Sequence, residues 1–234
     1  MSKLPISNKE RLIVALDVPT AKQAKELVET LGDSAVFYKI GLELFMSGEY
    51  FELLGWLNQH NKKIFVDLKF FDVPATVGRA VAQLNGKGVT FATIHGNDSI
   101  MRAAAVNKGD VKILAVTVLT SLVRGDLDDL GFDCDVSDLV LSRAKRAVEI
   151  GCDGVVASGQ EATVMRQKLG NSFMVITPGI RPIDNDDDQK RVVTAEQAFK
   201  NGADYIVVGR PIRDAADPKQ AAESLQEEIN SVFA

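Results

Sequence analysis

Charged side chains of both signs gather in a few short segments of the sequence that are otherwise apolar. The densest segment is DLKFFDVPAT, which follows the apolar run KIFV and contains Asp67, Lys69 and Asp72. Because side chains alternate along a strand, Asp67 and Lys69 would point to the same side. Asp17 and Lys39 lie in two further apolar segments, RLIVALDV and VFYKIG. Ionised groups are costly to bury unless paired, so these charges predict a functional charged site, with a structural salt bridge as the alternative for Asp67 and Lys69 alone.

Two glycine-arginine motifs near the C-terminus could bind an anion. Gly179 and Arg181 lie in TPGIRP, and Gly209 and Arg210 lie in VVGRP. Glycine lets backbone N–H groups approach an anion closely, and arginine offers a planar fork of donors to a phosphate. Either motif alone is more simply a turn with a solvated arginine, but together they predict a phosphate site.

Three further features carry weaker signals. Thr120 and Ser121 follow an apolar run and could hydrogen-bond the amide edge of a ligand. His95 also ends such a run, but a direct role for it is the less favoured interpretation. The acidic run 184–188 is interpreted as a solvated loop. With two cysteines and two histidines, the sequence predicts no disulfide framework and no cysteine-rich or histidine-rich metal site.

Eight short, β-branched runs alternate with longer segments of helical periodicity. The runs span residues 11–18, 36–41, 63–69, 89–95, 111–119, 154–158, 173–179 and 205–210. Such alternation predicts a parallel sheet whose crossover connections are helices. The helical segments have their own start signals: Thr20 with Gln23, Ser158 with Glu161 and Thr194 with Gln197 are typical of capping boxes, and Asp217-Pro218 of an N-cap and first helical residue.

The segmentation predicts an α/β fold, a (β/α)8 TIM barrel formed as a single domain over residues 1–234. A doubly wound open sheet is the lesser alternative. No Pro- or Ser-rich linker divides the chain. In a barrel of this kind, active sites lie at the carboxyl ends of the strands, and a phosphate is often held after the seventh and eighth strands. The charged residues and the glycine-arginine motifs above fall at those places.

The composition narrows the classes of protein further. The chain is 46% hydrophobic and 25% charged, which is ordinary for a globular protein. Its net charge of -5 disfavours non-specific binding to nucleic acid or to a membrane surface. No apolar run approaches the ~18 residues of a membrane helix, and the start MSKLPISNKER lacks the apolar core of a signal peptide. These observations predict a cytoplasmic protein with no nucleic-acid or membrane partner.

Taken in order, the motifs resemble those of the orotidine 5'-monophosphate decarboxylase family. The matching segments are ALD, YKIG, DLKFFDVPAT, VLTS, TPGIRP with a later DQKR, and VVGRP, and they cover nearly the whole chain. The D-x-K-x-x-D pattern alone is shared with a wider superfamily of barrel decarboxylases and aldolases, whereas all six segments in order are highly specific. The resemblance implies cofactor-free, metal-free decarboxylation of orotidine 5'-monophosphate to uridine 5'-monophosphate in de novo pyrimidine biosynthesis.

The resemblance also implies a catalytic array of Lys69, Asp67, Asp72 and Lys39, with Lys69 as the proton donor. Members of the family form homodimers with shared active sites, so the resemblance implies that Asp72 and Thr76 reach the site of the neighbouring subunit.

The substrate-binding residues that the resemblance implies are Asp17, Lys39, Thr76, Thr120, Ser121, Arg181, Gln189, Gly209 and Arg210. Asp17 and Lys39 correspond to ligands of the ribose hydroxyls, and Thr120 and Ser121 to pyrimidine recognition. Arg181, Gln189, Gly209 and Arg210 correspond to ligands on the phosphate side. One departure is that residues 183–188 are acidic and lack the glycine that relatives often have.

Two rival functions fit parts of the same pattern. A magnesium-dependent sugar-phosphate decarboxylase or aldolase would share D-x-K-x-x-D, but such relatives place an acidic metal ligand where this chain has Lys39. A non-catalytic nucleotide-binding barrel would keep the phosphate site, but it would have no need for Asp67, Lys69 and Asp72.

Overall fold

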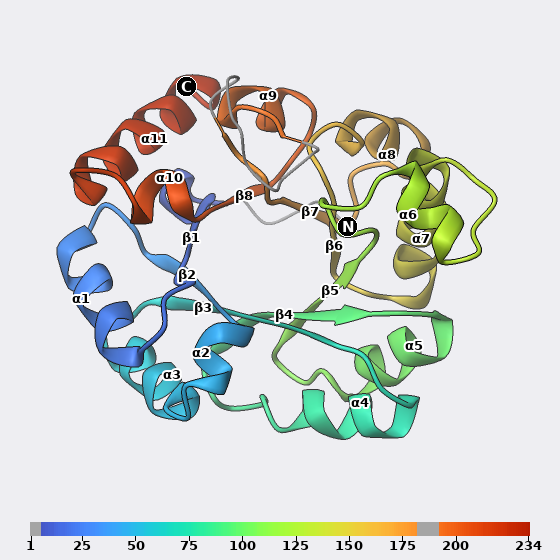
Figure 1. Cartoon of the computed structure of the whole chain (residues 1–234), viewed down its shortest axis with the longest axis horizontal. Helices are drawn as coiled ribbons and strands as arrows, with labels where there is room; N and C mark the ends of the chain where they lie inside the picture. The colour runs from blue at the N-terminus through green and yellow to red at the C-terminus, as the bar shows by residue number, and fades with distance from the viewer. Residues whose placement is uncertain (1–5, 182–191) are drawn as a thin grey trace.

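Eight parallel strands close into a barrel in the order β1 to β8 (Figure 1). The structure, a computed structural model, describes residues 6–181 and 192–234. The strands are β1 (Leu12–Ala15), β2 (Phe37–Gly41), β3 (Lys63–Phe70), β4 (Val89–His95), β5 (Lys112–Val116), β6 (Gly154–Val156), β7 (Met174–Thr177) and β8 (Tyr205–Val208). Because β1 pairs with β8 as well as with β2, the sheet has no free edge. This confirms a single (β/α)8 barrel and excludes the open doubly wound sheet.

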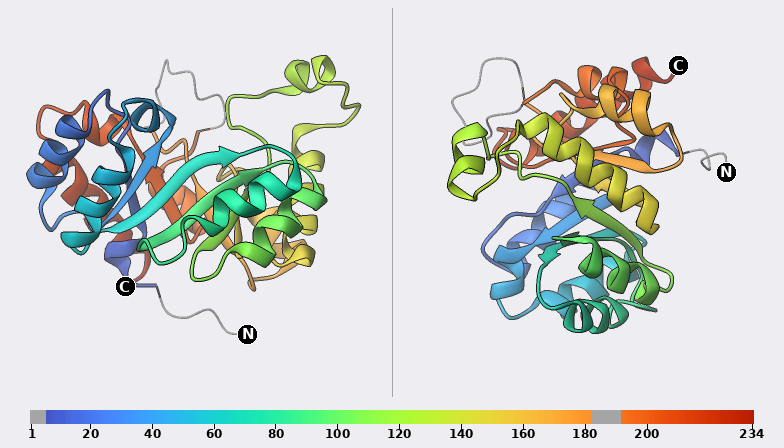
Figure 2. Two further views of the ribbon diagram at one scale, coloured as in Figure 1. Left: turned by 90° about the horizontal axis from the view of Figure 1, so that it is seen from below. Right: turned by 90° about the vertical axis from the view of Figure 1, so that its right-hand side faces the viewer.

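The helices form a ring around the barrel (Figure 1). The crossover helices are α1 (Ala21–Leu31), α3 (Tyr50–Gln59), α4 (Pro74–Ala82), α5 (Asp98–Asn107), α7 (Val136–Ile150), α8 (Ala162–Leu169), α9 (Ala195–Lys200) and α11 (Pro218–Val232). Shorter segments are the 3-10 turn η1 (Asn8–Glu10) and the helices α2 (Leu42–Met46), α6 (Arg124–Asp129) and α10 (Arg210–Arg213). Figure 2 shows α6 standing out from the body of the barrel. No helix in the described part of the chain is long and apolar enough to cross a membrane.

Most of the predicted helix starts are confirmed. Thr20 accepts a hydrogen bond from the Gln23 amide at the start of α1, at 3.2 Å. Thr194 caps α9, and Asp217 caps α11 immediately before a proline at the first helical position. These side-chain oxygens satisfy amides that have no partner within the helix, so the sequence signals mark the boundaries well.

The capping box predicted at Ser158 is wrong. Ser158 accepts a hydrogen bond from the Gln160 amide within a turn, and α8 begins only at Ala162 with Glu161 as its N-cap. Ser158 is completely buried, so its hydroxyl lies against the barrel instead of heading a helix. The same local sequence pattern can form either a capping box or a turn before the helix, and the path of the chain in the folded barrel decides which of the two forms.

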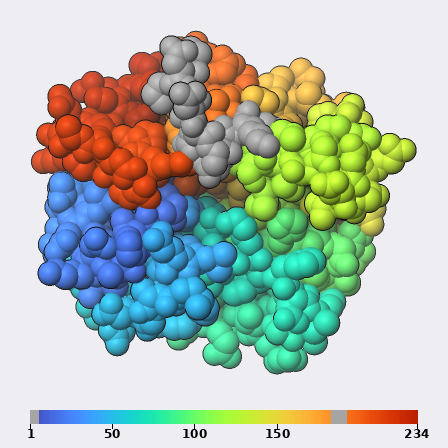
Figure 3. All heavy atoms as spheres, viewed as in Figure 1, coloured from blue at the N-terminus to red at the C-terminus, as the bar shows by residue number. Residues whose placement is uncertain are grey.

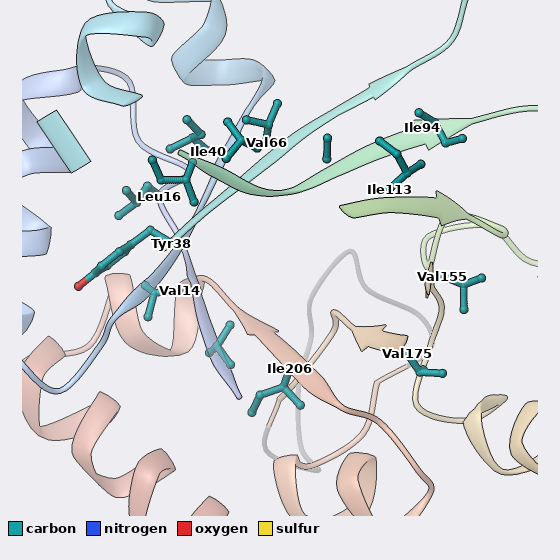
Figure 4. Packing of buried hydrophobic residues seen from close by; sticks show 14 of the residues in the cluster. Val14, Leu16, Tyr38, Ile40, Val66, Ile94, Ile113, Val155, Val175 and Ile206 are labelled. Carbon is teal, nitrogen blue, oxygen red and sulfur yellow. The ribbon is translucent and has the colours of Figure 1, made fainter. Parts of the chain in front are cut away.

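Side chains on the two faces of the strands form two hydrophobic cores. The outer core lies between strands and helices, and Figure 4 shows members such as Val14, Tyr38 and Val66 pointing outward from consecutive strands. The inner core fills the barrel with Phe37, Phe65, Phe91 and Tyr205, among others. The rings of Phe37 and Phe91 lie 5.1 Å apart, and those of Phe91 and Tyr205 lie 5.2 Å apart. These aromatic side chains pack closely inside the barrel, below the carboxyl ends of the strands.

Ion pairs also hold together the other end of the barrel, where the strands begin. Asp204, just before β8, accepts hydrogen bonds from the Arg166 guanidinium at 2.6 Å and from the Val175 amide at 2.8 Å. Asp153, just before β6, accepts from Lys108 and from the Ile113 amide, both at 2.8 Å. Each carboxylate therefore joins a strand start to a helix or its end, and these contacts serve the fold.

Candidate active site

The carboxyl ends of the strands surround a cavity of about 480 Å³. Where the ribbon of Figure 1 leaves an open centre, the space-filling view of Figure 3 shows that atoms occupy much of that space, apart from the area hidden behind grey atoms. The predicted residues that line the cavity are Asp17, Lys39, Asp67, Lys69, Thr120, Ser121, Arg181, Gly209 and Arg210. They come from the ends of six strands, as the barrel prediction required. Gln189 lies outside the described residues.

Four charged side chains meet on one side of the cavity. The Lys39 ammonium lies 2.8 Å from an Asp17 oxygen and 3.6 Å from Oδ2 of Asp67. The Lys69 ammonium lies 3.0 Å from the same Oδ2. The side chains of Lys39 and Asp67 are only 11% and 13% exposed, so their charges act in a poorly solvated environment. The signs alternate along the array, and each carboxylate contacts at least one ammonium group.

Two members of the array, Lys39 and Asp67, are held in their charged forms. Burial raises the pKa of the Asp67 carboxyl, but the positive charges of Lys39 and Lys69 and hydrogen bonds from Lys69 and Thr93 outweigh burial, so the pKa lies below its ordinary value. Burial lowers the pKa of Lys39, but Asp67 and Asp17 outweigh it, and the pKa lies above its ordinary value. Lys39 and Asp67 therefore remain ionised at neutral pH.

A glycine at the end of β2 makes room for the array. A Cβ on Gly41 would lie 3.2 Å from Nζ of Lys39 and 3.4 Å from Oδ1 of Asp17. Because the φ of Gly41 is −116°, the backbone there would accept any residue, but a side chain would require Nζ of Lys39 to move by a few tenths of an ångström.

An irregularity in β3 shapes the position of Lys69. Its φ is 47°, in the left-handed region that residues with a side chain rarely adopt. The pairing of β3 with β4 shifts at the same place, between Val66 and Phe70. The Thr93 hydroxyl on β4 contacts both Asp67 and the Lys69 backbone. Thr93 was not predicted from the sequence, although a polar residue within the apolar run FATI was the available signal.

Basic groups also line the cavity. Arg181 follows β7, and Arg210 begins the short helix α10 after β8. Gly179 has a φ of 76°, a conformation that favours glycine, at the turn that leads to Arg181. Arg213, which was not predicted from the sequence, also lines the cavity and donates a hydrogen bond to the Asp17 carbonyl. Three guanidinium groups in the lining of one cavity can bind a phosphate.

The remaining predicted residues divide between the rim and the outside. Thr120 and Ser121 lie half-buried on the rim, after β5. His95 lines a separate cavity near Phe71 and Arg143, and is absent from the lining of the charged one. Burial and the positive charges of Arg143 and Lys69 lower the pKa of His95, so it is neutral at pH 7. The structure therefore places His95 beside the site without a position in its wall.

Asp72 and Thr76 do not line the charged cavity of their own chain. Asp72 is exposed, and its carboxylate accepts a hydrogen bond from the Val73 amide at 2.6 Å. Both residues line a neighbouring groove on the outer side of Lys69, together with Phe71. No group of three or more His, Cys, Asp or Glu side chains suited to a metal ion occurs among residues 6–181 and 192–234.

Comparison with known proteins places the chain in a family. A protein from Methylococcus capsulatus named orotidine 5'-phosphate decarboxylase is 64% identical, with 100% of this chain and 98% of that protein covered. One of the same name from Stenotrophomonas maltophilia is 53% identical, with 99% and 97% covered. The crystal structure of orotidine 5'-phosphate decarboxylase from Lactobacillus acidophilus superposes with a TM-score of 0.83 at 36% identity, covering 94% of this chain and 99% of that one. The family model described as orotidine 5'-phosphate decarboxylase / HUMPS family matches residues 10–225, and the chain belongs to this family.

Proposed function

We propose that this chain decarboxylates orotidine 5'-monophosphate to uridine 5'-monophosphate without a cofactor, with Lys69 as the proton donor. The observation that carries the proposal is the meeting of Asp17, Lys39, Asp67 and Lys69 in one cavity that arginines also line. The names of the relatives support the same reaction. As in those relatives by name, the activity is that of a carboxy-lyase, and its place in metabolism is pyrimidine biosynthesis.

The difficulty of this reaction is the charge that it leaves behind. When the bond between C6 and the carboxylate carbon breaks, its electron pair stays on C6 in the plane of the ring, where the π system cannot delocalise it. The Lys69 ammonium faces this developing charge and then transfers its proton to C6, while CO2 leaves. Two unit charges ~4 Å apart interact by about 4 kcal/mol at an effective dielectric constant near ~20, so such a group lowers the barrier substantially.

The carboxylate of Asp67 adds a second contribution. With Asp67 fixed as an anion by Lys39 and Lys69, the substrate carboxylate placed beside it is repelled. The repulsion disappears as neutral CO2 forms, so it favours the transition state over the bound substrate. We rank this contribution below the stabilisation by Lys69.

The rest of the cavity suits a nucleotide. Asp17 and Lys39 bind the ribose hydroxyls, and Thr120 and Ser121 bind the amide edge of the pyrimidine ring. Arg181, Arg210 and the backbone at Gly209 bind the phosphate. Gln189, which lies outside the described residues, is proposed as a further ligand of the phosphate from the family resemblance alone. Binding energy from the phosphate, remote from C6, helps to order the charged array.

The proposed assembly is a homodimer in which each site is completed by the other subunit. Asp72 and Thr76 lie outside their own cavity, so their proposed roles require a second copy of the chain. Apolar side chains beside them are exposed, with Phe71 at 70% and Val73 at 62%. Such a patch around a charged residue suits burial against another subunit. The proposed location is the cytoplasm.

The direct test is to mix purified protein with orotidine 5'-monophosphate in EDTA and to follow the ultraviolet change to uridine 5'-monophosphate. We expect turnover at the same rate with and without EDTA. Loss of turnover in EDTA would favour the magnesium-dependent rival, although Lys39 would repel a cation bound beside Asp17 and Asp67. A nucleotide that binds and does not react would indicate a binding barrel.

A second test addresses the phosphate. Replacing Arg210 by Ala removes a charge-assisted contact worth roughly 1.5–3 kcal/mol, so we expect uridine 5'-monophosphate to bind about 10- to 200-fold more weakly. Titration calorimetry measures the dissociation constant, and uridine, which lacks the phosphate, serves as the control ligand. Arg210→Ala should leave the dissociation constant of uridine unchanged. Unchanged affinity for the monophosphate would remove Arg210 from the phosphate site.

A further inference from the structure

We propose that Thr93 is a positioning residue, whose hydroxyl fixes the Asp67 carboxylate and the Lys69 backbone relative to one another. The inference rests on the proposed function, because the geometry matters for catalysis only if Lys69 faces the reacting carbon. Thr93 lies on β4, is completely buried and does not line the cavity. It therefore acts on the substrate only through its neighbours.

Both hydrogen-bonding capacities of the Thr93 hydroxyl are used within the charged array. Its oxygen donates to Oδ1 of Asp67 at 2.8 Å and accepts from the Lys69 amide at 3.0 Å. A hydroxyl has one proton and two lone pairs, so both bonds form at once. One atom group thus connects the side chain of Asp67 with the main chain of Lys69, independently of the ion pair between their side chains.

The hydrogen bonds of Thr93 lie where the pairing of β3 with β4 is irregular. Val66 pairs with Ala92, and the next pair is Phe70 with Ile94, so residues 67–69 of β3 face Thr93 alone. A bulge of this kind redirects side chains and leaves backbone groups without a partner in the ladder. The Lys69 amide is bonded to the Thr93 side chain instead, and Lys69 keeps a φ of 47°. This hydrogen bond helps to offset the unfavourable backbone conformation of Lys69.

The same hydroxyl also fixes the orientation of the carboxylate. Because Thr93 bonds Oδ1 of Asp67, Oδ2 is left for Lys69 at 3.0 Å and Lys39 at 3.6 Å. A valine at position 93 has the same shape but no proton to donate and no lone pair to offer. Oδ1 of Asp67 and the Lys69 amide would then be buried without partners, and both would shift to find new ones.

A second buried threonine provides a matched control. Thr177 on β7 is also completely buried, but its hydroxyl has no hydrogen-bond partner among the described residues. Thr177→Val therefore removes the same group from the same kind of environment without breaking a bond. Thr93→Val and Thr177→Val differ in what the hydroxyl contacts.

The experiment measures kcat and KM for orotidine 5'-monophosphate in Thr93→Val, Thr93→Ser and Thr177→Val, with the number of folded sites counted by binding of uridine 5'-monophosphate. We expect kcat per site to fall about 100-fold in Thr93→Val, because a misplacement near 1 Å has that effect. KM should stay within about threefold, because the phosphate contacts are untouched. Thr93→Ser, which keeps the hydroxyl, and Thr177→Val should both stay within about threefold of wild type in kcat.

Three results would overturn the role of Thr93: kcat per site close to wild type in Thr93→Val, equal impairment in Thr93→Ser, or equal impairment in Thr177→Val. If Thr93→Val does not fold, Thr93→Ser is compared with Thr93→Ala, because alanine differs from serine only in lacking the hydroxyl. Equal kcat in these two would also overturn the role. Lys69→Ala in the same assay separates the two proposals. If it retains turnover, the proposed function fails, whereas if it is inactive and Thr93→Val is normal, only the role of Thr93 fails.

Discussion

Lys69→Ala should lower kcat by roughly 10⁴-fold or more while the protein stays folded. One side chain supplies both the electrostatic stabilisation, worth roughly 10²- to 10³-fold, and the proton, worth roughly 10²- to 10⁴-fold. Lys69 is one-third exposed and its ammonium contacts Asp67 at 3.0 Å, so its removal leaves no large cavity in the core. The measurement is single-turnover conversion of orotidine 5'-monophosphate, with binding of uridine 5'-monophosphate as the check on folding.

Lys108→Ala is the matched control for this experiment. Lys108 has a similar exposure, 27%, and contacts Asp153 at 2.8 Å, but it lies at the opposite end of the barrel. Its replacement should reduce stability and leave kcat per folded site unchanged. Turnover in Lys69→Ala within tenfold of wild type would refute the assignment of Lys69 as the proton donor.

Asp72→Asn and Lys69→Ala subunits, each inactive alone, should recover activity when they are mixed. If each site takes Lys69 from one subunit and Asp72 from the other, a hybrid dimer contains one site with both lesions and one site with neither. At statistical exchange, half of the dimers are hybrids, so about a quarter of all sites should be intact. The measurement is the rate after mixing at equal concentrations, compared with the mean of the two separate samples.

The control for mixing uses a subunit that carries both substitutions. Mixed with Lys69→Ala, this double variant can form no intact site, so the rate should stay at the background level. Exchange is followed independently, with differently labelled subunits. Complete exchange without recovery of activity would count against a site shared between subunits.

The fold was predictable because the local signals agree with one another. Eight apolar runs and the caps at Thr20, Thr194 and Asp217 all follow from short-range chemistry, and the barrel is the arrangement that satisfies them together. The exception was Ser158, where the same local pattern forms a turn before α8. Strand ends were also less predictable: the run 111–119 forms a strand only over Lys112–Val116.

The site was predictable in its members and less so in its geometry. Asp17, Lys39, Asp67 and Lys69 could be placed together because charges at strand ends converge in a barrel. The left-handed conformation of Lys69 could not be foreseen, because it depends on how β3 and β4 pair across the bulge. Thr93 was missed for the same reason, since its partners lie 24 and 26 residues away in the sequence. The direction of His95, into a separate cavity, also depends on the assembled barrel.

The ion pairs of Arg166 with Asp204 and of Lys108 with Asp153 have a consequence for how such a protein can change over generations. They lie at the end of the barrel where the strands begin, away from the cavity, whereas the charges of the array lie where the strands end. Changes in the free energy of unfolding from substitutions at distant sites generally add, so adaptation to a hotter or colder habitat can act on the ion pairs at the strand starts alone. A lineage can thereby retune its thermal tolerance while its chemistry remains as it was.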